Sequence, residues 1–263
     1  MYALYNIVFF YAKGGIDVIN KIKTLFKILL VASMVISSIY LYKALKEDSK
    51  QEKVFENLIE IAEETKGVKE EQKVEEDNIN IDNLYKLNSD IIGWIKIEGT
   101  NIDYPVMQTK NNPNYYLRKN FYKEYSVMGT PYLAEQCDIE RSDNLIIYGH
   151  HISNNKMFGE LEYYKDENYY KEHKTIKFYT REEKAEYEII SVFKTIAYTG
   201  FKYYNYCNIQ SESEFITFIN KCYDLAFYDT GKKAEYGDKL ICLSTCEYSQ
   251  ANGRLVVVAR KIK

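Results

Sequence analysis

The chain has 263 residues, which is enough for one domain with a buried core and additional segments. Its formal net charge of −3 at neutral pH argues against nucleic acid as the main partner, and its 3 Pro and 12 Gly exclude a collagen-like or Pro-rich low-complexity protein. The 5 cysteines and 3 histidines show no C-x-x-C pair and no zinc-ligand spacing, so we expect no metal site.

An apolar segment near the amino terminus predicts a membrane anchor. Residues Ile28 to Tyr42 carry no charge, a run slightly short of the roughly 20 residues that span a bilayer core. Lysines precede the run, and the lysines that follow it are joined by acidic residues, which favours an amino terminus inside the cell. A cleaved signal peptide and a buried helix are the alternatives, but no A-x-A cleavage pattern follows the run. We also hypothesise that translation starts at Val18, because "AKGG" ahead of it reads like a translated ribosome-binding sequence.

After the predicted anchor, the composition of the chain changes first to a charged segment and then to short apolar runs. Residues 44–80 are charged, and apolar residues between Val54 and Ala62 recur at helical spacing, which predicts an amphipathic helix followed by an acidic linker. From residue 81 onward, short runs rich in Ile, Val, Tyr and Phe alternate with turn residues. We therefore predict a cytoplasmic terminus and anchor over residues 1–43, a helix and linker over 44–80, and a globular domain over 81–263.

The globular part is predicted to be mainly β, with eight strands in a barrel or sandwich. The candidate strands are Ile91–Ile97, Ile102–Met107, Thr130–Ala134, Asn144–Tyr148, Thr175–Tyr179, Ala185–Ile196, Lys239–Thr245 and Arg254–Lys261. The stretch Ser211–Tyr228 differs, because Phe215, Phe218 and Cys222 have helical spacing after a Ser/Glu start suited to capping. A helix is therefore expected between two late strands.

The last two predicted strands bring a cysteine close to an arginine. "LSTC" ends one strand at Cys246, and "GRLVVVAR" opens the next strand at Arg254. Antiparallel strands joined by so short a turn place the two residues near each other, and the fixed charge of arginine favours a thiolate and later an oxyanion. Cys242 lies on the same strand face about 13 Å from Cys246, too far for a disulfide.

Two histidines follow another predicted strand. In "NLIIYGHH", His150 and His151 lie just after the strand's last residue. Because neighbouring strand residues point to opposite faces, only one of the two should meet the thiol, and position alone does not choose between them. A cysteine nucleophile needs an acid–base group and an oxyanion stabiliser, which a histidine and an arginine can provide.

The other cysteines and the third histidine are assigned no chemistry. We interpret Cys137, Cys207 and Cys222 as inert thiols, since an isolated cysteine is usually a small buried apolar residue. A Cys207–Cys222 bridge is kept as an alternative, because a compartment outside the cell permits disulfides. His173, in "YKEHKT", is interpreted as a surface residue.

These motifs together resemble the sortase family, and most closely its class B. "NLIIYGHH" is followed by "MFGEL", "LSTC" and "GRLVVVAR", and the likeness extends from about Asn83 ("NLYKLNSDIIGWIKIEGTNIDYPVMQ") to the end of the chain. Sortases are membrane-anchored cysteine transpeptidases of Gram-positive bacteria. The resemblance implies a sortase-type eight-stranded β-barrel with N-terminal helices and a helix inserted between two late strands.

The family pattern implies a role for each candidate residue. Its catalytic histidine follows a Tyr-Gly pair, which matches His150 and leaves His151 as a neighbour. Its nucleophile ends a Thr-Leu-x-Thr-Cys motif, which matches Cys246, and its arginine matches Arg254. Cys242 stands in place of the first threonine of that motif, and we expect this departure to change packing more than chemistry.

Substrate contacts are expected from three further residues. Leu117, in "NYYLRKNF", is expected to contact substrate by analogy with the family. Ser244 and Thr245 are expected to line the site, although both could simply complete a strand. No metal or organic cofactor is expected.

The resemblance implies a two-step acyl transfer at the cell surface. Cys246 would attack the Thr carbonyl of a C-terminal sorting signal in a secreted protein, and an amine of the peptidoglycan peptide would release the thioester. His150 would protonate the leaving amine and deprotonate the incoming one, while Arg254 would hold the substrate and stabilise the oxyanion. The enzyme would be a single-pass membrane protein with its catalytic domain outside the cell.

Two other functions compete with this interpretation. A Cys–His surface peptidase would use the same nucleophile but pass the acyl group to water. Papain-like enzymes, however, place the cysteine before the histidine and at the start of a helix. A non-enzymatic binding module on a membrane stalk gives no reason for His150, Cys246 and Arg254 to meet at strand ends.

Overall fold

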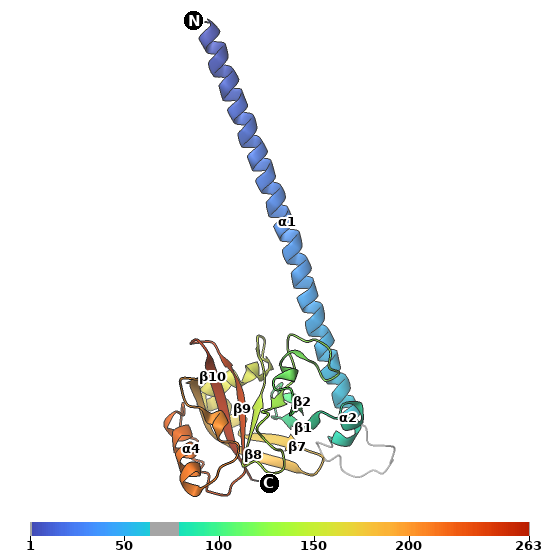
Figure 1. The fold of residues 1–263 in the computed structure, drawn as a ribbon, viewed down its shortest axis with the longest axis vertical. Helices are drawn as coiled ribbons and strands as arrows, with labels where there is room; N and C mark the ends of the chain where they lie inside the picture. The colour runs from blue at the N-terminus through green and yellow to red at the C-terminus, as the bar shows by residue number, and fades with distance from the viewer. Residues whose placement is uncertain (1, 64–78, 263) are drawn as a thin grey trace. The chain divides into compact units, whose positions relative to one another are not determined.

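The computed structural model describes residues 2–63 and 79–262, with side chains from Lys21 onward, and divides the chain after Lys50 into two units (Figure 1). The first unit is helical and belongs to α1 (Tyr2–Glu63). Its large apolar side chains between Ile22 and Leu45 are exposed, and the helix is long and apolar enough to cross a membrane by length and composition. The predicted acidic linker lies largely outside the described residues.

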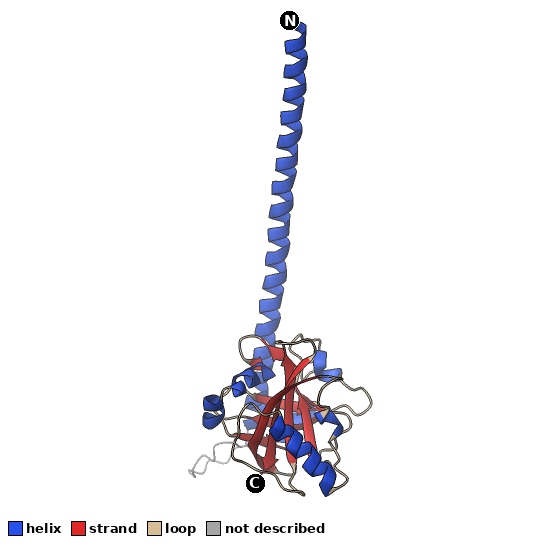
Figure 2. Cartoon of the chain, turned by 90° about the vertical axis from the view of Figure 1, so that its left-hand side faces the viewer, coloured by secondary structure: helices blue, strands red, loops and turns tan. Residues whose placement is uncertain are grey.

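The second unit contains a closed barrel of eight strands, which confirms the predicted fold class (Figures 1 and 2). The strand order around the barrel is β1-β2-β3-β4-β9-β10-β8-β7, and β7 closes the ring by pairing with β1. The β2–β3 and β4–β9 pairs are parallel and the others are antiparallel. The strands are β1 (Ile91–Lys96), β2 (Asp103–Met107), β3 (Tyr132–Leu133), β4 (Asn144–Tyr148), β7 (Thr175–Tyr179), β8 (Lys184–Ile196), β9 (Leu240–Glu247) and β10 (Gly253–Lys261).

Short helices and a small hairpin lie outside the eight barrel strands. The hairpin pairs β5 (His151–Ile152) with β6 (Lys156–Met157), and two of the three residues that join them, Asn154 and Asn155, have positive φ, which asparagine adopts more readily than most residues. The helices are α2 (Ile81–Leu87), α3 (Glu167–Glu172), α4 (Glu212–Asp224) and the 3-10 helices η1 (Tyr115–Arg118), η2 (Phe158–Lys165) and η3 (Tyr203–Asn205).

Helix α4 confirms the predicted late insertion. Ser211 caps its first turn by accepting a hydrogen bond from the Glu214 amide, and its buried residues recur at helical spacing. The Ser191 hydroxyl of β8 donates to the Cys222 carbonyl at 2.7 Å, which ties α4 to the barrel. Figures 1 and 2 both show α4 on the outside of the barrel wall.

Two boundaries differ from the predicted ones. The compact unit begins at Gln51 rather than Ile81, because Phe55 and Leu58 at the end of α1 are buried in the core and the Phe55 ring packs 4.9 Å from that of Tyr104. The third strand is shorter than predicted, because the Thr130 amide bonds to η1 instead of to the barrel. Strands β4 and β7 have the predicted bounds.

Candidate active site

The barrel topology brings three strand ends to one edge. Strands β4 and β9 are parallel neighbours, so their carboxyl ends lie at the same edge of the barrel, with Tyr148 opposite Ser244. Strand β10 runs antiparallel to β9, so its amino end reaches that edge too. His150 follows β4, Cys246 lies near the end of β9 and Arg254 lies near the start of β10. The fold therefore brings His150, which comes much earlier in the chain, to the edge where the β9–β10 hairpin carries Cys246 and Arg254.

The β9–β10 hairpin places Cys246 directly opposite Arg254. The two residues are register partners, so their side chains leave the same face of the sheet. Gly253 permits this close pairing, because a Cβ atom there would lie 2.3 Å from the Glu247 carbonyl oxygen. The Arg254 guanidinium donates to the Gly253 carbonyl at 2.8 Å, which directs it along the end of the hairpin. The predicted proximity of cysteine and arginine is thus present in the fold.

A partly buried ion pair joins the end of β9, beside the cysteine, to η2. The carboxylate of Glu247 is 2.7 Å from the Lys165 ammonium and accepts a 2.8 Å hydrogen bond from the Ser249 hydroxyl. Although burial opposes it, the hydrogen bond from Lys165 lowers the pKa of Glu247 below its ordinary value. Lys165 comes from η2, 82 positions earlier in the chain, so this contact could not be predicted from the local sequence.

His150 is positioned by the path of its backbone and by one hydrogen bond of its ring. Gly149 lets the backbone pass over Phe158, since a Cβ atom there would lie 2.5 Å from the Phe158 ring. The His150 Nε2 atom is 2.7 Å from the Leu117 carbonyl oxygen, which can only accept, so Nε2 carries the hydrogen. Burial, with a smaller contribution from the Arg118 charge, lowers the pKa of His150, while the Leu117 carbonyl opposes the shift. The lowered pKa favours the neutral ring at pH 7, and the hydrogen on Nε2 leaves Nδ1 as the basic nitrogen.

His151 has a different environment from His150. Its Nδ1 atom lies 2.9 Å from the Cys246 carbonyl oxygen, and its ring meets that of Tyr248 edge to face at 5.0 Å. His151 therefore contacts the backbone of β9 rather than the open site. The expected division of the two histidines between different surroundings is present in the structure.

One cavity of about 670 Å³ contains all three predicted catalytic residues in its lining. Leu117, Ser244 and Thr245, which we expect to contact substrate, line it as well. The remaining wall is rich in aromatic rings and amide groups, contributed mainly by Tyr132, Gln136, Tyr148, Tyr198, Tyr203 and Tyr204. The cavity thus combines a thiol, an imidazole and a guanidinium with a largely apolar wall, which suits a peptide substrate.

The two residues before Cys246 face different surroundings. Strand alternation puts Ser244 on the face of Cys246, where its hydroxyl hydrogen-bonds the Tyr203 hydroxyl. Thr245 points to the other face, and within the described part of the chain its buried hydroxyl has no protein partner. Leu117 is partly exposed at the cavity rim, and its carbonyl also holds His150.

The remaining thiols and His173 lie outside this site. Burial raises the pKa of Cys242 to about 12, so this thiol stays protonated, whereas Cys246 is partly exposed. The Cys207 sulfur lies 2.9 Å from that of Cys137, so its neighbour is not Cys222 as in the bridge considered above. His173 is partly exposed, and its Nδ1 atom is 2.8 Å from the Glu98 carbonyl oxygen.

Comparisons with known proteins agree on one family. A family profile described as "Sortase domain" matches residues 95–262. Sortase B of Staphylococcus aureus is 32% identical over 185 residues, which are 69% of this chain and 74% of that protein. Sortase B of Listeria monocytogenes is 33% identical over 182 residues, which are 68% of this chain and 72% of that protein. The crystal structure of Bacillus anthracis sortase B in complex with AAEK1 has a TM-score of 0.69 and 30% identity, covering 83% of this chain and 99% of that chain.

The barrel, the thiol–imidazole–guanidinium site and these relatives define a cysteine transpeptidase. The chain belongs to the sortase family, and within it to class B.

Proposed function

We propose that this sortase joins secreted proteins to the cell wall, with Cys246 as nucleophile, His150 as acid and base, and Arg254 as the group that stabilises the oxyanion. The observation that carries the proposal is the meeting of these three residues at the ends of three adjacent strands in one cavity. The substrate would be a secreted protein with a C-terminal sorting signal, and the acceptor an amine of the peptidoglycan peptide.

In the first half-reaction, the Cys246 thiol gives its proton to His150 and the sulfur attacks the carbonyl carbon of a threonine in the signal. Arg254, opposite Cys246 on the hairpin, would stabilise the negative charge that develops on the carbonyl oxygen. The C–N bond then breaks, and the His150 imidazolium donates its proton to the leaving amine. A thioester between the threonine and Cys246 remains.

In the second half-reaction, the acceptor amine attacks the thioester. His150 takes a proton from the amine and returns it to the departing sulfur, so the free thiol is regenerated and a new amide bond is formed. The lowered pKa of His150 supports this role, because a neutral ring is available at pH 7 to accept the proton.

The exposed apolar segment of α1 supports a location at the membrane. We propose that it is a single-pass anchor with its amino terminus inside the cell and the barrel outside, in agreement with the lysines that precede Ile28. The barrel would then meet secreted substrate and cell-wall acceptor on the same side of the membrane.

A fluorogenic peptide with a sorting-type signal tests the proposed reaction. The full chain in detergent is incubated with a panel of such peptides, with and without an amine acceptor, and the products are identified by mass spectrometry. We expect cleavage after threonine and an amide-linked product that appears only with the amine. Cleavage to the free acid alone would instead support a Cys–His peptidase, and the absence of turnover with every signal would favour a binding module.

A further inference from the structure

Two buried cysteines that the proposed reaction does not use lie against each other beside the active-site cavity. Cys137 follows β3 and Cys207 follows η3, and their sulfur atoms are 2.9 Å apart although the residues are 70 positions apart in the chain. This separation is shorter than the van der Waals contact of two sulfur atoms. All five cysteines lie in the described part of the chain and are free thiols there.

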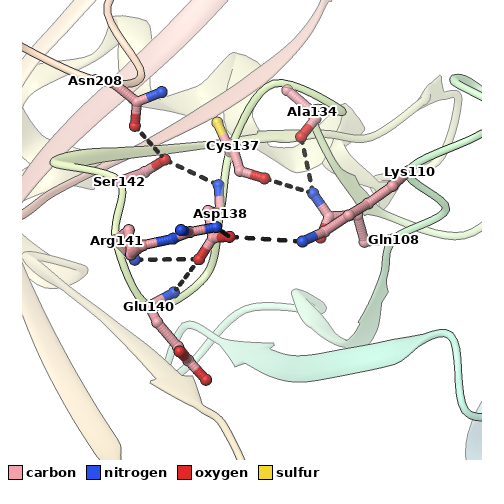
Figure 3. Close-up of polar contacts among 9 residues, drawn as sticks. All are labelled: Gln108, Lys110, Ala134, Cys137, Asp138, Glu140, Arg141, Ser142 and Asn208. Atoms are coloured by element: carbon pink, nitrogen blue, oxygen red, sulfur yellow. Dashed lines mark hydrogen bonds and ion pairs between the residues drawn. The ribbon is translucent and has the colours of Figure 1, made fainter.

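Hydrogen bonds that do not involve the sulfur fix the backbone around Cys137 (Figure 3). The buried Gln108 amide donates to the Cys137 carbonyl at 2.7 Å and to the Ala134 carbonyl at 3.0 Å. The turn that follows is closed by Asp138, whose amide donates to the Ser142 hydroxyl and whose carboxylate accepts from the Arg141 guanidinium, each at 2.8–2.9 Å. The Cys137 backbone is therefore already in place before any bond forms between the sulfurs.

The segment around Cys207 is hydrogen-bonded to the same turn. The Cys207 carbonyl accepts hydrogen bonds from the amides of Asp143 and Asn144 at 3.0 and 3.1 Å. The Ser142 hydroxyl donates to the Asn208 side chain at 2.8 Å, a contact that Figure 3 shows directly. Since both backbones are fixed around the two sulfurs, a covalent bond would require little movement of the main chain.

We propose that Cys137 and Cys207 form a disulfide bond that ties the segment after β3 to the segment after η3. The oxidant is a disulfide compound or a thiol oxidoreductase in its disulfide form. One cysteine thiolate attacks the oxidant, forming a mixed disulfide and releasing one thiol, and the second cysteine displaces the other thiol. Two protein thiols and one external disulfide thus become one protein disulfide and two external thiols.

Because each cysteine is only 2% exposed, exchange takes place during folding, and the closed bond is then shielded from reductants.

The bond would fix one wall of the active-site cavity. Gln136 precedes Cys137, Tyr203 and Tyr204 precede Cys207, and all three line the cavity that contains Cys246. Gln136 also donates to the Tyr204 carbonyl at 3.1 Å, so the two segments already touch at the wall. A bridge there also keeps both thiols from exchanging with Cys246, the partly exposed thiol of the site.

Peptide mapping of the refolded chain tests the bridge. The full chain in detergent carries Cys246→Ala, which prevents mixed disulfides at the reactive thiol, and is unfolded in urea with reductant and refolded in a glutathione redox buffer. After acid quenching, free thiols are alkylated under denaturing conditions. We expect one Cys137–Cys207 peptide and alkylation at Cys222 and Cys242 only. Four alkylated cysteines, or a bridge that uses Cys222 or Cys242, would overturn the proposal.

Thermal unfolding gives a second, independent measurement. A bridge that closes a loop of this length should raise the melting temperature of the oxidised chain over the reduced chain by roughly 5–15 °C. The shift should vanish in Cys137→Ser and persist in the matched control Cys222→Ala. A melting temperature that does not respond to reductant in the parent chain would contradict the bridge.

Discussion

The two sides of the candidate active site are held in place by different kinds of contact. Cys246 and Arg254 lie on a hairpin whose backbone pairs without a shift along all of β9. His150 follows the end of β4, and its ring position depends on one hydrogen bond to the Leu117 carbonyl and on the passage of Gly149 over a neighbouring ring. A backbone ladder tolerates changes of side chain, whereas a single contact does not. The hairpin therefore fixes the relative positions of Cys246 and Arg254, whereas the contacts of His150 determine how readily its ring takes up a proton.

The largest effect is expected on the hairpin side. Cys246→Ala should lower kcat/KM for a sorting-signal peptide by at least about 10⁴-fold, because it removes the attacking sulfur. The matched variant Cys242→Thr changes a buried thiol on the same strand and should keep activity within several-fold of the parent. The peptide assay checks both, and a dead Cys242→Thr variant that still folds would show that the nucleophile is wrongly assigned.

Replacing the arginine should leave the hairpin intact but slow the chemistry. Arg254→Gln should lower kcat by about 10²–10³-fold, because it removes a charged donor from the developing oxyanion. Arg260→Gln, on the same strand but outside the cavity, is the control and should change kcat less than about twofold. Equal losses in the two variants would mean that Arg254 acts on stability rather than on the reaction.

The ion pair between Glu247 and Lys165 should affect stability more than chemistry. Glu247→Gln should lower the free energy of unfolding by about 1–3 kcal/mol, because it leaves the Lys165 ammonium with a weaker partner beside the buried amide. Glu162→Gln, which changes the more exposed partner of the same lysine, should cost less than about 1 kcal/mol. Urea unfolding of the three chains measures both values.

The pH dependence of that effect has a definite sign. Because the pKa of Glu247 is lowered in the folded protein, its contribution is present above its ordinary pKa of 4.5 and is lost as pH falls through the lowered value. The difference between the parent and Glu247→Gln should therefore shrink at acid pH. A difference that stays constant from neutral pH to about pH 3 would contradict the ion pair.

The smallest effect is expected on the histidine side. Removing a nearby positive charge favours the imidazolium, so Arg118→Gln should raise the pKa of His150 slightly, and less at high salt. An NMR titration of the ring measures this value, with Arg181→Gln as the control. In the parent the pKa should lie below 6.5, so stability falls as pH drops through that value, since the unfolded chain binds the proton more tightly. A His150 pKa above 6.5 would contradict the effect of burial.

Much of the fold could be predicted because its signals are local. Short apolar runs bounded by turn residues predict the bounds of β4 and β7 to the residue, and helical spacing with a serine cap predicts α4. The approach of Cys246 to Arg254 follows from a short turn between two strands. The small hairpin of β5 and β6 and the short helix α2 were not predicted, because two-residue strands and a seven-residue helix carry too little periodicity.

The contacts that could not be predicted all join distant parts of the chain. Leu117 meets His150 from 33 positions away, and Lys165 meets Glu247 from 82 positions away. The Cys137–Cys207 contact likewise joins residues 70 positions apart, and no local pattern predicts it. Sequence patterns thus indicate which residues lie at strand ends. The contacts that set the pKa values and positions of the site residues come from distant segments that only the closed barrel brings together.

Direct detection of the covalent intermediate tests the central claim, namely that Cys246, His150 and Arg254 act on one substrate carbonyl. The full chain in detergent is mixed with a sorting-signal peptide without acceptor, quenched in acid and mapped by mass spectrometry. We predict a thioester of the amino-terminal part of the peptide on Cys246, which disappears when an amine is added and forms much more slowly in Arg254→Gln. Product formation without this adduct, or an adduct on another cysteine, would contradict the account.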